Sequence, residues 1–530
     1  MKIVVSGATG FVGRACTLAL LGAGHQVTAL ARDPRRARGV LGAEAAIADL
    51  RDTEATRAAL LAADGVVNLA GEDILARRWT AARRRVLWDS RVQTTATLVA
   101  HLRARRAPLS VFVSASAVGW YGDRGDELLD ERAAGGADFT AELCRAWEDA
   151  ALAAGSSASR VVLARLGIVL GGEGGALARL RPLFRLGLGG PVGGGAQWVP
   201  WIHLEDAARA LRFLLEADGT RGAAAVHGPV NLVAPQPARN RELAAAVGAA
   251  LGRPARLPAP ALALRVALGA RAALLLGGQR VEPAVLRAAG FAFRHPELGA
   301  AVAEALAPPA EVSIERAVER SAERAAELAT PERRAAPPAS PYLRARPARY
   351  ELTCRTVIPR PLAEVFPFFA APENLGALTP PDLRFTLDGP RPTLAADATI
   401  DYRLRALGAP LRWRTLLEAW EAPDDARPAR ARFVDAQLRG PYASWWHEHR
   451  FAEDAEDAGH TVMEDRVRYR PPLGWLGRLA HWLVLRAELR RIFAHRRRAI
   501  LLRFGDDAPA AQASAQFAAT PMSTSSGTES

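Results

Sequence analysis

A short glycine-rich turn follows the first apolar run of the chain and constrains the fold more than any other feature. Residues 3–5 are Ile-Val-Val, and they predict a buried strand over 2–6 that passes into an amphipathic helix over 11–21. In this position glycines allow a tight turn, close approach of backbone N–H groups to a pyrophosphate and close packing of helix on strand. The turn therefore predicts a dinucleotide site in an α/β domain. The turn reads Gly7-Ala8-Thr9-Gly10-Phe11-Val12-Gly13.

The length and charge of the chain limit the number of domains and the kinds of partner that we expect. A chain of 530 residues is too long for one core, so we expect two or three domains. Its net charge of +13 comes almost wholly from arginine, because Lys2 is the only lysine. Heavy use of Ala, Gly and Pro accompanies this bias. We therefore attribute the charge to composition and predict no nucleic-acid partner.

Cysteine usage and hydropathy indicate the compartment. The three cysteines are far apart and odd in number, which fits neither a disulfide framework nor a metal site. The first strand is predicted to begin at residue 2, which leaves no room for a signal peptide. No apolar run is long enough to span a membrane. These features predict a cytoplasmic protein.

The pattern of apolar runs divides the chain. Strand-like runs at 26–31, 65–69, 109–114 and 161–166 alternate with helical patterns, as in a Rossmann-type doubly wound parallel sheet. We predict a first domain over 1–306, a Pro-rich and charged linker over 307–347, and a second domain over 348–505. The last of these shows alternating strands closed by an amphipathic helix over 475–504. The Ala/Ser/Thr-rich tail, 506–530, is predicted to be disordered.

Further residues of the first domain are candidates for cofactor binding. Arg32 ends the second predicted strand, 19 residues after Gly13, where an NAD site would carry an acidic residue. Arginine at this position favours the 2′-phosphate of NADP over NAD, although arginine is abundant enough here to occur by coincidence. The other candidates, at the ends of later strands, are Asp49, Leu50, Leu69, Ala70, Gly71 and Ser114.

A series of motifs in the first domain resembles the atypical NAD(P)-dependent epimerase/dehydratase-like family of extended short-chain dehydrogenases/reductases. The resemblance covers residues 1–306, including a small C-terminal domain of unknown function at about 250–300. It implies a Rossmann fold and an NAD(P) cofactor, and leaves the substrate open. The motifs include Asn68-Leu69-Ala70-Gly71, Arg78-Trp79-Thr80, Ser90-Arg91-Val92, Ser114-Ala115-Ser116, Trp147-Glu148, Arg165-Leu166-Gly167, Gln197-Trp198 and Trp201-Ile202-His203.

The catalytic pair typical of the superfamily, Tyr-x-x-x-Lys, is missing. Phe139 and Leu143 stand where the resemblance would place it. Ser116 aligns with the superfamily's catalytic serine, and Tyr121 is the only tyrosine before residue 342. These two residues, with Arg91 or His203 supplying charge or a proton, are the catalytic candidates.

Each catalytic candidate also has a structural interpretation. Ser116 could bond the backbone of the turn, and Tyr121 could pack on the sheet. Arg91 could pair with a carboxylate. His203, which precedes two acidic residues, could begin a helix.

The second domain resembles the START-like, polyketide-cyclase-type (SRPBCC) superfamily, an α+β helix-grip fold around an apolar cavity. His447 and His449 fall on one face of a predicted strand, but no third ligand is evident, so we predict a polar ladder and no metal. The motifs include Val357-Ile358-Pro359-Arg360-Pro361, Asp401-Tyr402, Trp413-Arg414-Thr415 and Gly440-Pro441-Tyr442. The predicted pocket-lining residues are Trp413, Trp420, Trp445, Trp446, Trp475 and Trp482.

Two functions fit these observations. One is an NADP-dependent oxidoreductase or epimerase-like enzyme tethered to a domain that binds a hydrophobic small molecule. The other is a non-catalytic NAD(P)-sensing module joined to a lipid or polyketide carrier. Loss of the Tyr/Lys pair favours the second, whereas the retained serine turn and the segment 174–203 favour the first. The substrate and the oligomeric state are not determined by the sequence.

Overall fold

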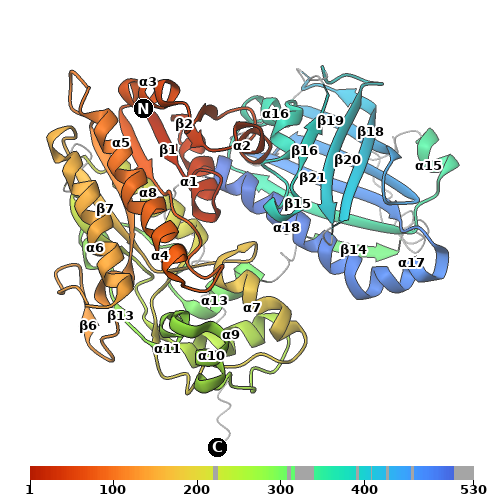
Figure 1. Cartoon of the computed structure of the whole chain (residues 1–530). Helices are drawn as coiled ribbons and strands as arrows, with labels where there is room; N and C mark the ends of the chain where they lie inside the picture. Colours follow the sequence, from red (N-terminus) through yellow and green to blue (C-terminus); the bar gives the residue numbers. More distant parts are fainter. Residues whose placement is uncertain are drawn as a thin grey trace, which may run out of the picture.

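The chain forms two lobes that meet along two helices (Figure 1). The computed structural model describes residues 1–218, 225–306, 312–316, 340–389, 393–406, 409–424, 429–454, 457 and 459–505. Among these residues, no helix combines the length and apolar character needed to cross a membrane.

A seven-stranded parallel sheet forms the centre of the first lobe. Its order is β11-β7-β5-β4-β1-β2-β3, so the strand order reverses beside β1. The Rossmann-type sheet is thus confirmed, and every strand predicted for it is present. In sheet order the strands are Gly228–Leu232, Val161–Leu166, Val111–Ala117, Gly65–Asn68, Lys2–Ser6, Gln26–Ala31 and Ala46–Asp49.

Helices cover both faces of this sheet, because its buried strands are apolar on both sides. Ile3 and Val5 of β1 pack in a core with α1 (Phe11–Gly22), α2 (Pro34–Leu41) and α8 (Leu204–Glu216). Val4, on the opposite face, packs in a core with α3 (Thr53–Ala62), α5 (Thr94–Leu102) and α6 (Phe139–Leu152). Between these helices lie α4 (Ala81–Trp88), a π-helical turn η1 (Asp89–Gln93) and two 3-10 turns, η2 (Val118–Tyr121) and η3 (Ala153–Ser156).

A smaller subdomain is built onto the carboxyl edge of the sheet. It is held by three two-stranded ladders and a core that joins α7, α9 and α13. The ladders pair β8 (Ile168–Gly171) with β10 (Trp201–His203), β9 (Trp198–Val199) with β12 (Ala238–Arg239), and β6 (Leu128–Leu129) with β13 (Arg280–Val281). The helices are α7 (Gly175–Arg185), α9 (Asn240–Leu251), α10 (Ala261–Leu268), α11 (Ala273–Leu276), α12 (Ala284–Ala288) and α13 (Leu298–Leu306), with a 3-10 turn η4 (Gly269–Ala272).

The second lobe is an eight-stranded antiparallel sheet with one long helix against it. In the sheet order β14-β15-β21-β20-β19-β18-β17-β16, the strands are Val312–Arg316, Tyr350–Ile358, Thr461–Arg470, Ser444–Glu453, Arg430–Arg439, Ala409–Glu421, Thr399–Ala406 and Thr386–Asp388. Helix α18 (Arg486–Phe504) packs Leu489 and Phe493 against β15 and β21. The other helical segments are α15 (Pro341–Ala345), α16 (Leu362–Phe369), η6 (Pro372–Leu375), η7 (Pro381–Leu383), α17 (Gly474–Ala480) and η8 (His481–Leu485).

Part of the predicted linker belongs to this second lobe. Residues 312–316 form β14, which pairs with β15, and 341–345 form α15. The remaining linker residues, 307–311 and 317–339, and the tail, 506–530, lie outside the described residues.

Of the six tryptophans predicted to line a pocket, three are buried, two are exposed, and Trp420 is partly buried against an apolar core. Trp413, Trp445 and Trp446 are buried, as expected of pocket or core residues. Trp475 and Trp482 are 63% and 73% exposed, so the prediction that they line a pocket is wrong. They lie on the solvent side of α17 and η8, whereas His481 of η8 is buried and stacks on Tyr350 of β15.

The two lobes share a packed interface between α1 and α18. Leu18 of α1 lies in the apolar core of the second lobe, and Ala15 and Ala19 pack with Leu502 of α18. A Cβ added at Gly22 would overlap the carbonyl oxygen of Arg503. Arg503 also donates to Glu44 of the first lobe at 2.7 and 2.9 Å. Small residues on α1 therefore let the two helices approach closely.

We expect Gly22→Ala to separate α18 from α1, because the added methyl group meets backbone that cannot rotate away. Overpacking of this kind costs about 1–3 kcal/mol. Urea denaturation and limited proteolysis would show the loss of stability. Gly299→Ala is the matched control, since a Cβ added there meets open space. Equal stability of the two variants would contradict a close α1–α18 contact.

Candidate functional site

The glycine-rich turn lies between β1 and α1 at the carboxyl edge of the parallel sheet. Gly7 has a φ of +69°, and a Cβ there would overlap Leu69 of the segment after β4. A Cβ at Gly13 would overlap the carbonyl oxygen of Gly7. Within the described chain no side chain caps α1, and its first turn carries no acidic residue. The backbone N–H groups of this helix end are therefore arranged to bind an anion.

The other predicted cofactor residues gather at the same edge. Leu69 N donates to Ser6 O at 3.1 Å, and Leu50 N donates to Ala31 O at 2.9 Å. Ser114 accepts from the buried Asn68 amide at 3.2 Å and supports the sheet. Asp49 ends β3 and accepts from Arg51 N at 2.9 Å. These contacts hold the loops that follow four neighbouring strands.

Arg32 follows β2 and lies at this edge with most of its side chain free of protein. Its side chain is 71% exposed, and its one ion pair in the described chain is with Glu72, at 3.3 Å. Glu72 follows Gly71, which contacts the guanidinium of Arg91. An exposed cation beside the glycine turn is the feature that a 2′-phosphate requires.

Ser116 and Tyr121 are joined by a buried polar chain. Ser116 Oγ donates to Glu148 Oε1 at 2.6 Å. Arg165 grips both oxygens of Glu148, at 2.8 and 2.9 Å, and its NH1 donates to the Tyr121 hydroxyl at 3.1 Å. The four residues come from β5, α6, β7 and η2. The geometry thus brings together two of the four predicted catalytic residues and adds a carboxylate and a guanidinium that sequence reasoning did not assign.

The environment of Tyr121 keeps its phenol protonated. Burial raises the pKa of Tyr121, although the adjacent Arg165 and Asn231 oppose the shift. The hydroxyl donates to Asn231 Oδ1 at 2.8 Å or to Asp130 O at 3.0 Å. Tyr121 and Ser116 are both fully buried. A phenol in this setting is a proton donor at neutral pH and a poor base.

Arg91 serves a different part of the site. Its guanidinium donates to Glu72 O at 2.9 Å and to Leu87 O at 3.3 Å, and lies 5.3 Å from the centre of the Trp147 ring. Burial lowers the pKa of Arg91. These contacts fasten the segment after β4, and in the described chain they do not reach Ser116 or Tyr121.

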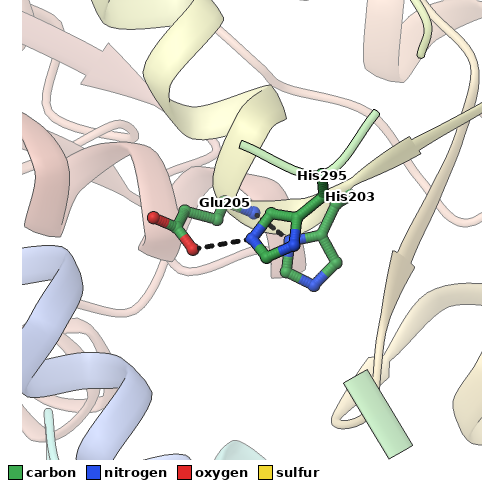
Figure 2. Close-up of side chains that lie close together, drawn as sticks. All are labelled: His203, Glu205 and His295. Atoms are coloured by element: carbon green, nitrogen blue, oxygen red, sulfur yellow. Dashed lines mark hydrogen bonds and ion pairs between the residues drawn. The ribbon is translucent and has the colours of Figure 1, made fainter. Parts of the chain in front are cut away.

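His203 belongs to a separate cluster with Glu205 and His295 (Figure 2). His203 begins α8, and its Nδ1 accepts from Glu205 N at 3.3 Å, as in the predicted helix start. Its Nε2 lies 2.8 Å from Glu304 Oε2. His295 contacts Glu205 Oε2 at 3.0 Å. Against the effect of burial, His295 and Arg294 lower the pKa of Glu205 to about 2.

This cluster has the ligand types of a metal site, but its donor atoms already have partners. Both nitrogens of His203 are engaged within the protein, and Glu205 pairs with the guanidinium of Arg294 as well as with His295. The contacts join α8, the segment around residue 295 and α13. We therefore interpret the cluster as structural.

The second lobe reaches the glycine turn through charged side chains of α18. Arg14 of α1 is buried, contacts His495 Nε2 at 2.7 Å and donates to Ala377 O. His495 and Arg498 both contact Glu173, the latter at 2.8 Å. A Cβ added at Gly174 would overlap the Phe11 ring, so this loop touches the turn itself. Nothing in the sequence reveals these pairs, because their members are hundreds of residues apart.

The fold and the turn define an NAD(P)-binding Rossmann domain of the extended type. Comparison with family models agrees: residues 3–226 match the NAD dependent epimerase/dehydratase family, and 259–305 match a domain of unknown function, DUF1731. The chain belongs to this epimerase/dehydratase family. The resemblance inferred for the first domain, including the small C-terminal domain, is confirmed.

Several proteins of the same family are similar to this chain over about 310 residues. An epimerase family protein of Mycobacterium bovis, Mb2239, is 40% identical over 308 residues, which are 58% of this chain and 98% of that protein. The human epimerase family protein SDR39U1 is 40% identical over 311 residues, or 58% of this chain and 100% of that protein. A crystal structure of the human protein (isoform 2) with NADPH is similar at a TM-score of 0.52, with 39% identity, and covers 57% of this chain and 99% of that one.

The buried Glu148–Arg165 pair yields a stability prediction. Burial lowers the pKa of Arg165, but its contacts with Glu148 outweigh this and raise it. Arg165→Met leaves the carboxylate of Glu148 buried without its cation, which should cost about 3–5 kcal/mol. The double variant Arg165→Met/Glu148→Leu should recover much of this loss. Free energies of unfolding from urea titrations would test it, and a double variant no more stable than the single one would contradict the argument.

Proposed function

We propose that residues 1–306 form an NADP(H)-dependent oxidoreductase or epimerase-like enzyme that acts on a small hydrophobic molecule. One observation carries the proposal: the guanidinium of Arg165 lies 3.1 Å from the phenol oxygen of Tyr121. A cation beside a tyrosine is what the missing lysine would otherwise supply. Family membership supports the cofactor class and leaves the substrate open.

Tyr121, Arg165 and Ser116 would each have a separate role in a carbonyl reduction. When bound, NADPH supplies the hydride. Tyr121 donates its proton to the carbonyl oxygen as negative charge develops there, and Arg165 stabilises the phenolate that remains. Ser116, fixed by Glu148, would orient the carbonyl. Because the pKa of Tyr121 is raised, the neutral phenol predominates at neutral pH, so reduction should be faster than oxidation.

Arg32 should select the phosphorylated cofactor, because a guanidinium binds a 2′-phosphate through two hydrogen bonds. The human relative solved with NADPH supports this assignment. We expect Arg32→Ala to lower NADPH affinity by about 1–3 kcal/mol and to leave NADH affinity nearly unchanged. Titration calorimetry with both cofactors measures the difference. Arg106→Ala is the control, because Arg106 is exposed and precedes β5, at the opposite edge of the sheet from the glycine turn. Equal binding of NADPH and NADH by the wild type would refute the assignment.

The role of Tyr121 is tested by replacing its hydroxyl alone. Tyr121→Phe should reduce the rate of NADPH oxidation about 10²–10⁴-fold if the phenol is the general acid. Hydrophobic metabolite extracts serve as the substrate source, and the nicotinamide absorbance reports turnover. Ser116→Ala should also slow the reaction. Turnover that neither variant affects would mean that other residues carry the chemistry.

A second function is favoured by the burial of the same residues. Ser116 and Tyr121 are sealed from solvent, as expected if the domain binds NADP(H) without turning it over. In that case the protein senses the cofactor and delivers the signal to its second lobe. NADPH that binds but never decays with any extract would support this alternative over the enzyme.

For the second lobe we propose a helix-grip, START-like domain that binds a hydrophobic ligand. Support comes from α18 packed along the antiparallel sheet and from a cluster of aromatic rings. The ring centres of Trp413 and Trp445 lie 5.4 Å apart in an edge-to-face arrangement, and those of Tyr442 and Trp445 lie 4.8 Å apart. The proposed boundary stays within 307–347. The three buried cysteines are unpaired, which fits the proposed cytoplasmic location.

A further inference from the structure

We propose that Asp435, His447 and His449 in the second lobe bind a divalent transition-metal ion of the zinc class. Asp435 lies on β19 directly opposite His447 on β20. His449 is two residues further along β20 and therefore lies on the same face. That face is the one covered by α18, because Arg496 of α18 contacts both His449 and Asp465.

The distances between the donor atoms are close to those around a tetrahedrally coordinated metal ion. Asp435 Oδ2 lies 3.5 Å from His447 Nδ1 and 3.2 Å from His449 Nε2. All three donor atoms lie within 4.8 Å of one another. Metal–ligand bonds of about 2.0–2.1 Å give a tetrahedron whose edges are about 3.3 Å. An ion therefore fits among these atoms with side-chain adjustment alone.

The far side of each imidazole has the partner that metal-binding histidines require. Asp465 Oδ1 lies 3.0 Å from His447 Nε2 and 2.7 Å from His449 Nδ1. Its other oxygen lies 3.2 Å from Arg496 Nε. Carboxylates placed in this way fix the ring orientation and leave the opposite nitrogens to bind a metal. The Arg496 NH2 contact to His449, at 3.2 Å, is also on the Nδ1 side, away from Asp435.

A polar ladder of neutral imidazole rings does not account for this arrangement. All four imidazole nitrogens face carboxylate oxygens, at 2.7–3.5 Å. Two neutral rings carry only two N–H groups, so two of the four nitrogens would face carboxylates with lone pairs. Either a second proton on each ring or a metal ion beside Asp435 removes this repulsion. Asp435 and Asp465 together outweigh the charge of Arg496, which also favours a cation. The prediction that this domain holds no metal depended on the lack of a third ligand, and the fold supplies Asp435.

The site leaves one coordination position open. Three protein ligands are the number that a reactive zinc site uses, the fourth position being taken by water or substrate. The side chain of Asp435 is 18% exposed, whereas His447 and His449 are nearly sealed. The open position and the route of entry therefore lie on the Asp435 side.

The test is a Co²⁺ titration of the full chain after dialysis against a chelator. Tetrahedral Co²⁺ gives intense visible absorption, which reports geometry independently of any activity. We expect saturable binding with this signature and a higher Tm with Zn²⁺. Asp435→Asn and His447→Gln should abolish the signal. Asp465→Asn, which only orients the rings, should weaken binding about 10–100-fold.

His203→Gln is the matched control, because it disrupts the other histidine cluster and leaves this one intact. Circular dichroism shows whether each variant folds, and Asp435→Asn, with its partly exposed side chain, is the least disruptive of them. Retention of the signal in His203→Gln with loss in Asp435→Asn supports the proposal. Absence of tetrahedral Co²⁺ absorption in the wild type, or loss of it only in His203→Gln, overturns the proposal.

Discussion

The close packing of α1 on three neighbours is the constraint on which the rest of the structure depends. Nine successive residues, Gly13–Leu21, are buried, because the helix touches the parallel sheet, α8 and α18 at once. Glycine or alanine lies at each close approach: Gly13 against the turn, Ala15 and Ala19 near α8 and α18, and Gly22 against Arg503. The helix end that is arranged to bind an anion is therefore held by both lobes.

Local features of the fold could be predicted from the sequence. The strands 2–6, 26–31 and 161–166 are found with the predicted bounds, because a short apolar run between turns is a local signal. Strand β14 lies in the predicted linker, since its pairing with β15 depends on residues about 40 positions away. Trp475 and Trp482 lie on the exposed side of a helical region whose opposite side packs His481 on the sheet. The apolar pattern over 475–504 predicted a helical region, but it did not show which of its side chains contact the sheet.

The sequence predicted only those parts of the candidate site that belong to a recognisable local motif. The turn and the cofactor residues follow from glycine spacing and strand ends. Glu148 and Arg165 belong to motifs that carry the family resemblance. Their ion pair forms because α6 packs against β7, and the spacing of the two residues in the sequence does not predict that contact. Asp435 and Asp465 were missed for the same reason: each lies on a strand next to that of the histidines. Cross-strand register, which the sequence of one strand does not contain, brings them together.

An arginine beside the buried phenol makes contacts that a lysine could not make. A guanidinium has donors in several directions, so Arg165 binds Glu148 with two nitrogens and still reaches Tyr121 with the third. A lysine ammonium could not hold the carboxylate bidentately. The cost is mobility, because the fork fixes the phenol between Arg165 and Asn231. In the enzyme that we propose, a substrate would reach the buried Tyr121 only after a shift of η2, the short turn that carries it.

Helix α18 connects the two proposed sites physically. His495 and Arg498 are three positions apart, share one face and meet Glu173 beside the glycine turn. Arg496 points to another face and holds Asp465 behind the two imidazoles. Helix α18 is therefore a structural element that the proposed cofactor site and the histidine cluster have in common.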